Sequence, residues 1–307
     1  MRVFVTGATG WVGAAVVKDL LAVGHQVLGL ARAEDKAAAL AATGAEVLRG
    51  TLDDLDLLRQ GASEADAVIH TAFNHDFSKF AENCAQDERA ILAMGAVMEG
   101  TEKQILVTSG MARLAEGQGR LATEADRPPP VSPAYPRASE AAARALAGRG
   151  VRVGAVRLPP SVHGKGDHGF MARLIELARQ TGVSAYIGEG LNGWASVHRF
   201  DAAPVYRLAL ESSVADDIFH AVADEAVPFK AIAEVIGRQL GVPVRSLTPE
   251  QAAAHFGWFA MFAGLEMTAS SRQTRDWLGW RPTHASLLAD LEEGHYFGAA
   301  ASSKFAE

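Results

Sequence analysis

Two hydrophobic periods alternate along the first half of the chain. Short apolar runs rich in β-branched residues predict strands, and the segments between them repeat apolar residues every three or four positions, which predicts helices. The predicted strands are residues 2–8, 26–32, 45–50, 66–73, 103–110 and 151–159. The predicted helices are residues 11–23, 33–43, 54–63, about 76–99 and a segment that starts near Pro136. This alternation predicts an α/β fold, in which helices cover both faces of a doubly wound parallel sheet.

Composition and charge narrow the class of protein. The chain has 307 residues, is 49% hydrophobic and carries a formal net charge of −7, which suits one or two domains with a sizeable core. No run of Lys or Arg suggests a nucleic-acid partner, and no apolar run approaches the ~20 residues of a membrane span. Cys84 is the single cysteine and cannot form an internal disulfide. The first predicted strand leaves no room for a signal peptide, so we expect a cytoplasmic protein.

The first predicted turn contains three glycines at a spacing that suits a dinucleotide. Gly7 permits a tight turn, Gly10 removes the Cβ that would block a phosphate, and Gly13 lets the helix pack closely on the strand. The helix that follows presents unpaired N–H groups and a positive dipole end to the pyrophosphate. We therefore expect a Rossmann-type cofactor site, to which the rest of the turn also contributes: Thr9, Trp11 and Val12.

The end of the second predicted strand indicates which cofactor binds. An NAD site usually places Asp or Glu about 20 residues past the glycines, on the ribose 2′-hydroxyl. Here Arg32 stands at the strand end, and its guanidinium suits a 2′-phosphate. Glu34 and Asp35 match the first turn of the next helix, where acidic residues favour the dipole. The sequence thus favours NADP(H) over NAD(H).

Four segments together resemble a known family. TGATGWVG (6–13), DAVIHTA (66–72), LVTSG (106–110) and RLPPSVHG (157–164) are similar to the extended and atypical branches of the short-chain dehydrogenase/reductase superfamily, in the NAD-dependent epimerase/dehydratase group. The resemblance covers about residues 1–225. It implies that the nicotinamide is lined by the ends of later strands, with these expected cofactor contacts: Thr71, Ala72, Phe73, Pro159, Pro160, Ser161 and Val162.

The resemblance also implies two domains. We expect a dinucleotide-binding Rossmann domain at residues 1–164, with later strands returning from about 195–225, and a mainly substrate-binding or lid portion at 165–307. Residues 218–241 resemble the family's strand and amphipathic helix. Residues 255–267 hold seven large apolar side chains, which suit a buried helix, a substrate lid or a subunit interface. Plain core packing is the simplest of these interpretations, and a lid would indicate an apolar or aromatic substrate.

The family's catalytic residues are only partly present. The resemblance implies a Ser on the fifth strand, a Tyr that exchanges a proton with substrate, and a Lys four residues later that lowers the pKa of that Tyr. Ser109 matches the serine, and Tyr135 follows 26 positions later. The fourth residue after Tyr135 is Ser139, which has no charge to replace that of the lysine.

Three hypotheses follow from the missing lysine. In the first, Tyr135 still donates the proton, and the absent cation is replaced by one of Arg137, Arg144, His163 or Lys165. In the second, the proton donor is a histidine, one of His70, His75, His163 or His198. In the third, the protein binds NADP(H) without turnover, as a redox-sensing partner. Against all three stands the plain interpretation that Pro136 is the first helical residue and Tyr135 a partly exposed residue before it.

Two further segments carry candidate substrate residues. Residues 162–169 bring three polar side chains and three glycines together, which favours a mobile loop over the active site rather than a metal site, and we expect no metal. In 194–203, the family pattern is a strand that leads into a helix capped by Asp201. The expected substrate contacts are His163, Trp194 and His198.

The sequence as a whole predicts an enzyme. We expect hydride transfer between NADP(H) and a carbonyl or related group of a small, mostly apolar substrate. One alternative is an NAD-dependent sugar-nucleotide epimerase or dehydratase, although basic ligands for a substrate pyrophosphate are not identifiable. The other is a non-catalytic NADP(H) sensor. The sequence leaves open whether the protein forms a homodimer.

Overall fold

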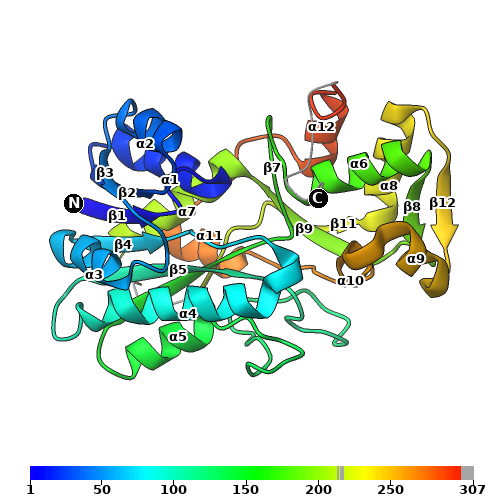
Figure 1. Ribbon diagram of the computed structural model, residues 1–307. Coiled ribbons are helices and arrows are strands. Elements are labelled where there is room, and N and C mark those ends of the chain that lie inside the picture. The colour runs from blue at the N-terminus through cyan, green and yellow to red at the C-terminus, as the bar shows by residue number, and fades with distance from the viewer. Residues whose placement is uncertain (213, 215–217, 299–307) are drawn as a thin grey trace.

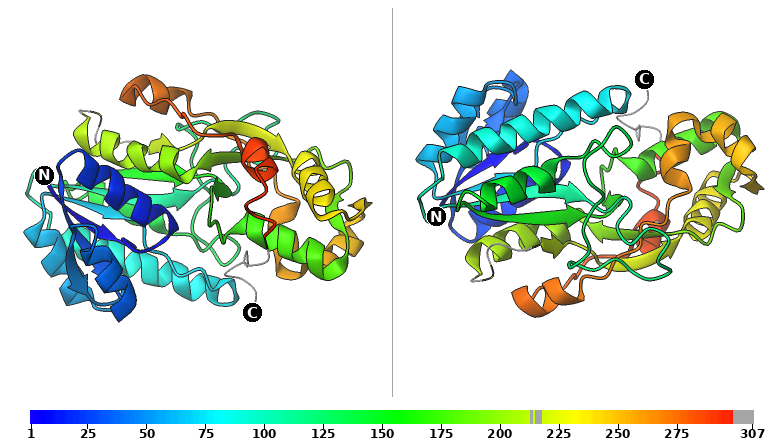
Figure 2. Two further views of the ribbon diagram at one scale, coloured as in Figure 1. Left: turned by 90° about the horizontal axis from the view of Figure 1, so that it is seen from above. Right: turned by 90° about the horizontal axis from the view of Figure 1, so that it is seen from below.

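The computed structural model describes residues 1–212, 214 and 218–298. A large sheet with helices on both faces forms one part, and a smaller part packs against one end of it (Figure 1). Figure 2 shows from above and below that the smaller part lies beyond the carboxyl ends of the strands, where parallel sheets bind ligands. The predicted fold class, a Rossmann-type sheet with a smaller C-terminal portion, is confirmed.

The large sheet has seven parallel strands in the order β10-β6-β5-β4-β1-β2-β3. The chain therefore builds outward from β1 to one edge, returns to the centre and builds outward to the other edge, as in doubly wound folds. The strands are β1 (Arg2–Thr6), β2 (Gln26–Ala31), β3 (Glu46–Arg49), β4 (Ala67–His70), β5 (Gln104–Gly110), β6 (Arg152–Leu158) and β10 (Ile218–His220).

Helices cover the two faces of this sheet as separate layers (Figure 1). The first layer is α1 (Trp11–Ala22), α2 (Glu34–Ala41) and α7 (Arg199–Glu211), and the second is α3 (Leu55–Glu64), α4 (Phe80–Ala96) and α5 (Ser139–Ala147). Successive strand residues serve opposite layers, since Val3 and Val5 pack in the first core and Phe4 in the second. A short helical turn, η1 (Phe77–Lys79), precedes α4.

The smaller part has two small sheets, with strand orders β11-β9-β7 and β12-β8. Their strands are β7 (Ser161–His163), β8 (Ser184–Ile187), β9 (Gly193–His198), β11 (Asp224–Pro228) and β12 (Val244–Leu247). The helical elements of this part and the C-terminal region are α6 (Phe170–Thr181), α8 (Phe229–Leu240), α9 (Pro249–Phe256), η2 (Gly257–Phe259), α10 (Ala260–Ala263), α11 (Arg272–Leu278) and α12 (Leu287–Glu292).

Two local predictions, the start of the fifth helix and the cap of α7, are wrong, and the prediction for residues 218–241 is incomplete. The fifth helix of the large part begins at Ser139 instead of near Pro136. Residues 218–241 contain a second strand, β11, between the predicted strand and helix. The cap of α7 is His198, whose Nδ1 accepts from the Phe200 N–H at 3.3 Å, because Asp201 points away to the backbone of residues 283 and 284.

The apolar segment 255–267 divides its side chains between the core and the surface. Phe256, Phe259 and Met267 are buried in the core of the smaller part. Trp258 and Met261, in contrast, are 37% and 61% exposed. The expectation of plain core packing is therefore right for only one face of this segment.

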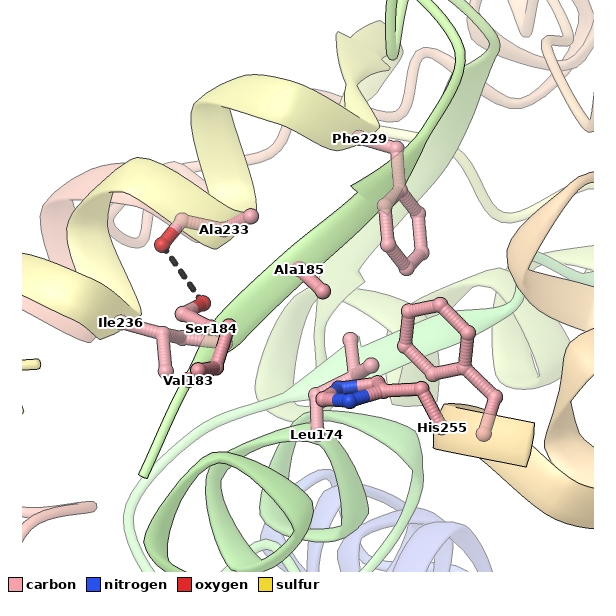
Figure 3. A pocket seen from close by; sticks show the side chains of 9 residues that line it. Leu174, Val183, Ser184, Ala185, Phe229, Ala233, Ile236 and His255 are labelled. Carbon is pink, nitrogen blue, oxygen red and sulfur yellow. Dashed lines mark hydrogen bonds between the residues drawn. The ribbon is translucent and has the colours of Figure 1, made fainter. Parts of the chain in front are cut away.

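A small cavity lies inside the smaller part, between α6, β8, α8 and α9 (Figure 3). His255 and Phe256 of α9 are among its lining residues, and so is Ser184, which donates to the Ala233 carbonyl at 2.8 Å. Its volume of about 10 Å³ holds a water molecule at most. This cavity is too small for a substrate and belongs to the packing of the core.

Candidate active site

The glycine turn has the geometry of an anion cradle. Gly7 adopts φ +68°, and its carbonyl accepts from the Gly10 N–H at 2.8 Å. Gly10 caps α1 without a side-chain hydrogen bond, and the first turn of α1 contains no acidic residue. The first N–H groups of this helix are thus available to a phosphate, which the helix dipole also favours.

Close packing explains why glycines are needed here. A Cβ on Gly13 would lie 2.1 Å from the Gly7 carbonyl oxygen, and a Cβ on Gly7 would lie 2.7 Å from the Ala72 nitrogen. Thr71 donates its hydroxyl to the Thr6 carbonyl at 2.8 Å. The turn, α1 and the residues that follow β4 therefore meet at one place, and the predicted contacts Thr71 and Ala72 border the turn.

Trp11 joins the turn to the segment after β6. Its indole Nε1 donates to the Val162 carbonyl at 2.7 Å, and the Arg199 guanidinium lies 4.1 Å from its ring centroid. The predicted contacts Pro159, Pro160 and Ser161 precede Val162 on the same segment. The structure thus brings the predicted cofactor residues of this segment to the edge of the sheet that carries the glycine turn.

Arg32 directly follows the last residue of β2. Its side chain is exposed, and within the described ranges it has no hydrogen-bond or ion-pair partner. Glu34 forms an ion pair with Arg49, which also donates to the Arg32 carbonyl at 3.3 Å. The acid nearest to Arg32 is thereby turned towards β3, and a guanidinium occupies the position where an NAD site has a carboxylate.

A buried hydrogen-bond network converges on Asp87 of α4. His70 Nε2 lies 3.0 Å from Asp87 Oδ1, and the Ser139 hydroxyl donates to Asp87 Oδ2 at 2.6 Å. The other His70 nitrogen, Nδ1, lies 2.7 Å from the Thr6 hydroxyl. Because a carboxylate only accepts, His70 donates to Asp87 through Nε2. Burial would raise the pKa of Asp87, but the hydrogen bond from His70 and the Arg137 charge outweigh it and lower that pKa.

Arg137 extends this network to the carboxyl end of the sheet. Its Nε donates to the Ser139 hydroxyl at 2.8 Å, and its Nη2 donates to the Thr108 carbonyl at 3.2 Å. Its guanidinium carbon lies 4.1 Å from the centroid of the Phe73 ring. We call the set Thr6, His70, Asp87, Ser139 and Arg137 the Asp87 network.

Tyr135 lies in a turn ahead of α5, not at its start. The turn is closed by two backbone hydrogen bonds of 3.0 Å between Ser132 and Tyr135. The side chain is buried, so the interpretation of Tyr135 as a partly exposed residue before a helix is wrong. Burial raises its pKa, and the Glu140 charge adds to this, while the Arg137 and Arg157 charges oppose it. The phenol therefore keeps its proton at neutral pH.

Ser109 shares a face of the sheet with this region. It is buried and lies opposite Arg157 in the register of β5 and β6, on the side covered by α4 and α5. The catalytic roles of Ser109 and Tyr135 stay predictions. Of the cations considered as replacements for the lysine, Arg144 instead lies 3.9 Å from Glu140 and is half exposed, whereas Arg137 belongs to the Asp87 network.

A second buried network surrounds Arg157 on β6. Its Nε and Nη2 bind the two Glu140 carboxylate oxygens at 2.8 and 2.9 Å, and Nη2 also donates to the Asp126 carbonyl at 2.7 Å. Its Nη1 lies 3.1 Å from His220 Nε2, while His220 Nδ1 lies 2.8 Å from the Ser270 carbonyl. Burial lowers the pKa of His220 to about 3, and the Arg157 charge contributes. We call this group the Arg157 network.

The predicted substrate residues lie on β7 and β9. His163 is fully buried, with Nδ1 2.8 Å from Asp290 Oδ2 and Nε2 without a partner among the described residues. His198 stacks on His284 with ring centroids 4.5 Å apart. Burial lowers the pKa of His198 to about 4, with a contribution from the His163 charge. Trp194 is buried in the core of the smaller part, and all three substrate contacts stay predictions.

The loop after β7 is tied to the C-terminal region. The Tyr296 hydroxyl donates to Asp167 Oδ2 at 3.0 Å and accepts from the Gly164 N–H at 3.2 Å. Asp167 is buried, which raises its pKa. The loop is thus anchored at two points, and its expected mobility stays a prediction.

Aromatic side chains connect the two parts of the molecule. Phe77 of η1 stacks on Trp258 with ring centroids 5.1 Å apart, and it also contacts Phe170 and Phe262. Phe73, which carries Arg137 on its ring, contacts Phe80 at 6.0 Å. We call this group the aromatic bridge: Phe73, Phe77, Phe80, Phe170, Trp258 and Phe262. It places apolar surface beside the Asp87 network.

Three members of the Asp87 network are not identifiable as a group from the sequence. No motif singles out Thr6 or Asp87, and Ser139 stands out only by the charge that it lacks. A signal for Asp87 was present, since it occupies the helical stripe of α4 that also contains the buried residues Cys84, Ile91 and Met94. A carboxylate on a buried stripe needs a partner, and His70 at a neighbouring strand end can supply one.

These features define a dinucleotide-binding protein of the Rossmann class. A model of the NAD(P)H-binding family matches residues 7–167, slightly more than half of the chain, and the chain belongs to this family. The resemblance to the extended and atypical short-chain dehydrogenases/reductases is confirmed. Among the described residues, none of the helices combines the length and apolar character that a membrane crossing requires.

Relatives are found over nearly the whole length. An uncharacterized protein of Schizosaccharomyces pombe is 48% identical and is matched over 97% of this chain and 100% of its own. A 4-hydroxy-2-methyl-3-oxo-4-farnesyl-3,4-dihydroquinoline-1-oxide ketoreductase of Stigmatella aurantiaca is 25% identical over 98% of both chains. The structure of Thermus thermophilus UDP-glucose 4-epimerase with NAD has a TM-score of 0.75 at 21% identity and covers 97% of this chain and 100% of its own. At this identity, the similarity to the epimerase structure shows a shared fold and nothing about activity.

Proposed function

We propose that the protein is an NADP(H)-dependent reductase that transfers hydride to the carbonyl of a small, mostly apolar substrate. The observation that carries the choice of cofactor is the exposed Arg32 at the end of β2, beside a Glu34 that is held by Arg49. A guanidinium there binds a 2′-phosphate through charge-assisted hydrogen bonds. Glu34, one of the two acids of the following helix turn, is paired with Arg49 and not directed at a ribose 2′-hydroxyl.

The cofactor would be held at two points, one at the start of α1 and one after β2. The N–H groups at the start of α1 suit the pyrophosphate, and Arg32 suits the 2′-phosphate. NADPH supplies the hydride when it is bound. Glycine at positions 7 and 13 keeps the turn, α1 and the residues after β4 in close contact, and the missing Cβ of Gly10 would let the pyrophosphate approach the backbone.

The chain supplies the proton and the orientation of the substrate. The Tyr135 phenol is protonated at neutral pH, because burial raises its pKa, and it can therefore donate to the oxygen that becomes the alcohol. Ser109 at the end of β5 would bind the same oxygen. A reductase needs an acid at this step, so the high pKa of Tyr135 suits reduction better than oxidation.

The aromatic bridge favours an apolar substrate. Phe77, Trp258 and Phe262 join the two parts of the molecule next to the strand ends. The ketoreductase of Stigmatella aurantiaca, whose name describes a farnesylated quinoline substrate, also supports reduction of an apolar carbonyl. The alternatives are a sugar-nucleotide epimerase that retains NAD and a sensor that binds NADP(H) without consuming it.

Cofactor choice is tested by titrating NADPH and NADH into the protein and following nicotinamide fluorescence. Arg32→Ala removes one charge-assisted contact, so we expect NADPH affinity to fall about 10- to 100-fold and NADH affinity to change little. Arg59→Ala is the matched control, since Arg59 is an exposed arginine that pairs with Asp56 at 2.5 Å. Equal losses for both cofactors in Arg32→Ala would refute the 2′-phosphate contact.

A further inference from the structure

The position of the family's lysine is occupied by a hydrogen-bond relay. Ser139 is completely buried, and its hydroxyl donates to Asp87 while it accepts from Arg137 Nε. Asp87 in turn accepts from His70, whose other nitrogen is bonded to Thr6. The Ser139 hydroxyl and His70 Nε2 both donate to the Asp87 carboxylate, so the Ser139 oxygen accepts from Arg137 through a lone pair.

The guanidinium of Arg137 is held on three sides. Nε is fixed by Ser139, Nη2 by the Thr108 carbonyl, and one face by the Phe73 ring. Nη1 has no hydrogen-bond partner within the described ranges, and none of the carboxylates described there lies within ion-pair distance of Arg137. The side chain is half-buried, which leaves one edge of a fixed cation for a ligand.

The open edge of Arg137 lies near the predicted catalytic residues Ser109 and Tyr135. Thr108 directly precedes Ser109 on β5, and Phe73 follows β4, so Arg137 bridges the ends of the two strands. Tyr135 lies two residues before Arg137 and senses its charge. Arg137, Ser109 and Tyr135 thus approach the same strand ends from one side of the sheet.

We propose that Arg137 is a catalytic residue whose Nη1 binds the carbonyl oxygen of the substrate, and that Ser139, Asp87 and His70 are its positioning residues. The inference rests on the proposed reductase function and adds the group that stabilises negative charge. Arg137 takes over the electrostatic part of the missing lysine's task from a different position in the sequence.

The reaction balances with Arg137 as an electrostatic group only. With NADPH bound, its hydride would add to the carbonyl carbon and leave NADP⁺, the π pair would move to oxygen, and the oxygen would take the proton of the Tyr135 hydroxyl. A proton from the buffered solvent would then restore Tyr135. Arg137 keeps its own protons, because a guanidinium does not dissociate in this range, and it stabilises the oxygen while charge develops there.

The first experiment measures NADPH consumption with 9,10-phenanthrenequinone, an apolar dicarbonyl, as the probe. Arg137→Met should lower kcat about 10²- to 10³-fold, the usual loss for one oxyanion donor, with unchanged NADPH affinity. Ser139→Ala should lower kcat by a smaller factor, because the guanidinium is retained but no longer fixed. Arg149→Met is the matched control, since Arg149 is exposed and pairs with Glu99.

Chemical rescue separates catalysis from folding. Arg137→Ala leaves room for a free guanidinium ion, so guanidinium chloride at millimolar concentration should restore part of the lost kcat, while the same concentration of sodium chloride should not. A variant damaged only in its structure would not recover. An unchanged kcat in Arg137→Met, or a loss that guanidinium does not restore in Arg137→Ala, would overturn the inference.

A second measurement does not depend on turnover. 4-Nitrophenol is an apolar oxyanion probe, and its ionised form absorbs visible light. In the complex with NADP⁺, we expect the protein to bind the phenolate at least about tenfold better than the phenol, and Arg137→Met to remove this preference. The same preference in wild type and Arg137→Met would contradict the inference even if the quinone is no substrate. Failure to bind NADP⁺ at all would instead refute the proposed function.

Discussion

The Asp87 network and the Arg157 network are built from the same kinds of groups but are completed differently. Each is buried beside the N-terminal end of α5, and each joins an arginine, an acid and a histidine. In the Arg157 network every guanidinium nitrogen has a partner within the protein. Arg137, at the end of the Asp87 network, keeps one nitrogen without a partner among the described residues and makes no close ion pair with the described carboxylates.

This difference distinguishes an arginine that stabilises the fold from one that is available to a ligand. A buried arginine that is completely bonded can only hold elements together, and here it ties β6, α5 and β10. An arginine that is fixed by its bonds but left with an open edge is prepared for a ligand. Variants of the two networks should therefore separate stability from activity.

The largest effect on stability should come from the acid of the Arg157 network. Glu140→Ala leaves the fully buried Arg157 without its counter-charge, so we expect the free energy of unfolding to fall by about 3–5 kcal/mol. Urea unfolding at pH 7, followed by circular dichroism, measures this loss. Arg144→Ala is the control, because its 3.9 Å contact with the same acid is half exposed and should cost under about 1 kcal/mol. Similar losses in the two variants would contradict the distinction.

A smaller loss is expected when the relay of the Asp87 network is cut. Ser139→Ala removes the hydrogen bond to Asp87 and the one from Arg137 but leaves His70 in place. We therefore expect the free energy of unfolding to fall by about 1–3 kcal/mol. The same urea experiment gives the value. A loss as large as that of Glu140→Ala would mean that both networks serve mainly to hold the fold.

The histidine of the Arg157 network should make stability depend on pH. The pKa of His220 is about 3 in the folded protein and near its ordinary value of ~6.5 in the unfolded chain. Between these values the unfolded chain binds one more proton, so stability falls as the pH drops, by up to about 1.4 kcal/mol per pH unit. His220→Gln can keep both hydrogen bonds without titrating, and its urea midpoint should fall less steeply between pH 6.5 and 5. An unchanged slope would show that His220 is not the group responsible.

The smallest effect on stability should come from Arg137 itself. Arg137→Met keeps the Asp87–Ser139 and Asp87–His70 bonds and retains an apolar chain over Phe73. The variant loses the hydrogen bonds of a half-buried guanidinium to the Ser139 hydroxyl and the Thr108 carbonyl, so we expect the free energy of unfolding to fall by about 1 kcal/mol, although this variant should lose most of its activity. Thermal unfolding with and without NADPH measures it, and a loss above 3 kcal/mol would make Arg137 a structural residue.

The fold was predictable because its determinants are local. The glycine turn depends on the spacing of Gly7, Gly10 and Gly13, and the strands depend on short apolar runs whose ends differ from the observed ends by only a few residues. The position of Arg32 directly after β2 follows from the same local pattern, and its cofactor role stays a prediction. Element boundaries near Pro136 failed, since the turn that holds Tyr135 depends on burial that no local pattern reports.

The Asp87 network was not predictable in this way. Ser139 and Asp87 are 52 positions apart and meet only when α4 and α5 pack side by side. In the sequence, Ser139 is noticeable only as the absence of a lysine, and Arg137 is one of several basic residues nearby. Which of these basic residues lies beside Ser139 was therefore a question that tertiary packing alone could answer.

The Tyr296 hydroxyl, which bonds to Asp167 and Gly164, affects the order in which the molecule can be completed. N-terminal segments fold first during synthesis, so the glycine turn and β1 to β5 can assemble while residue 296 is still missing. The loop after β7 receives its anchor only when nearly all of this sequence has been made. A nascent chain can thus form its glycine turn well before the loop beside His163 is secured.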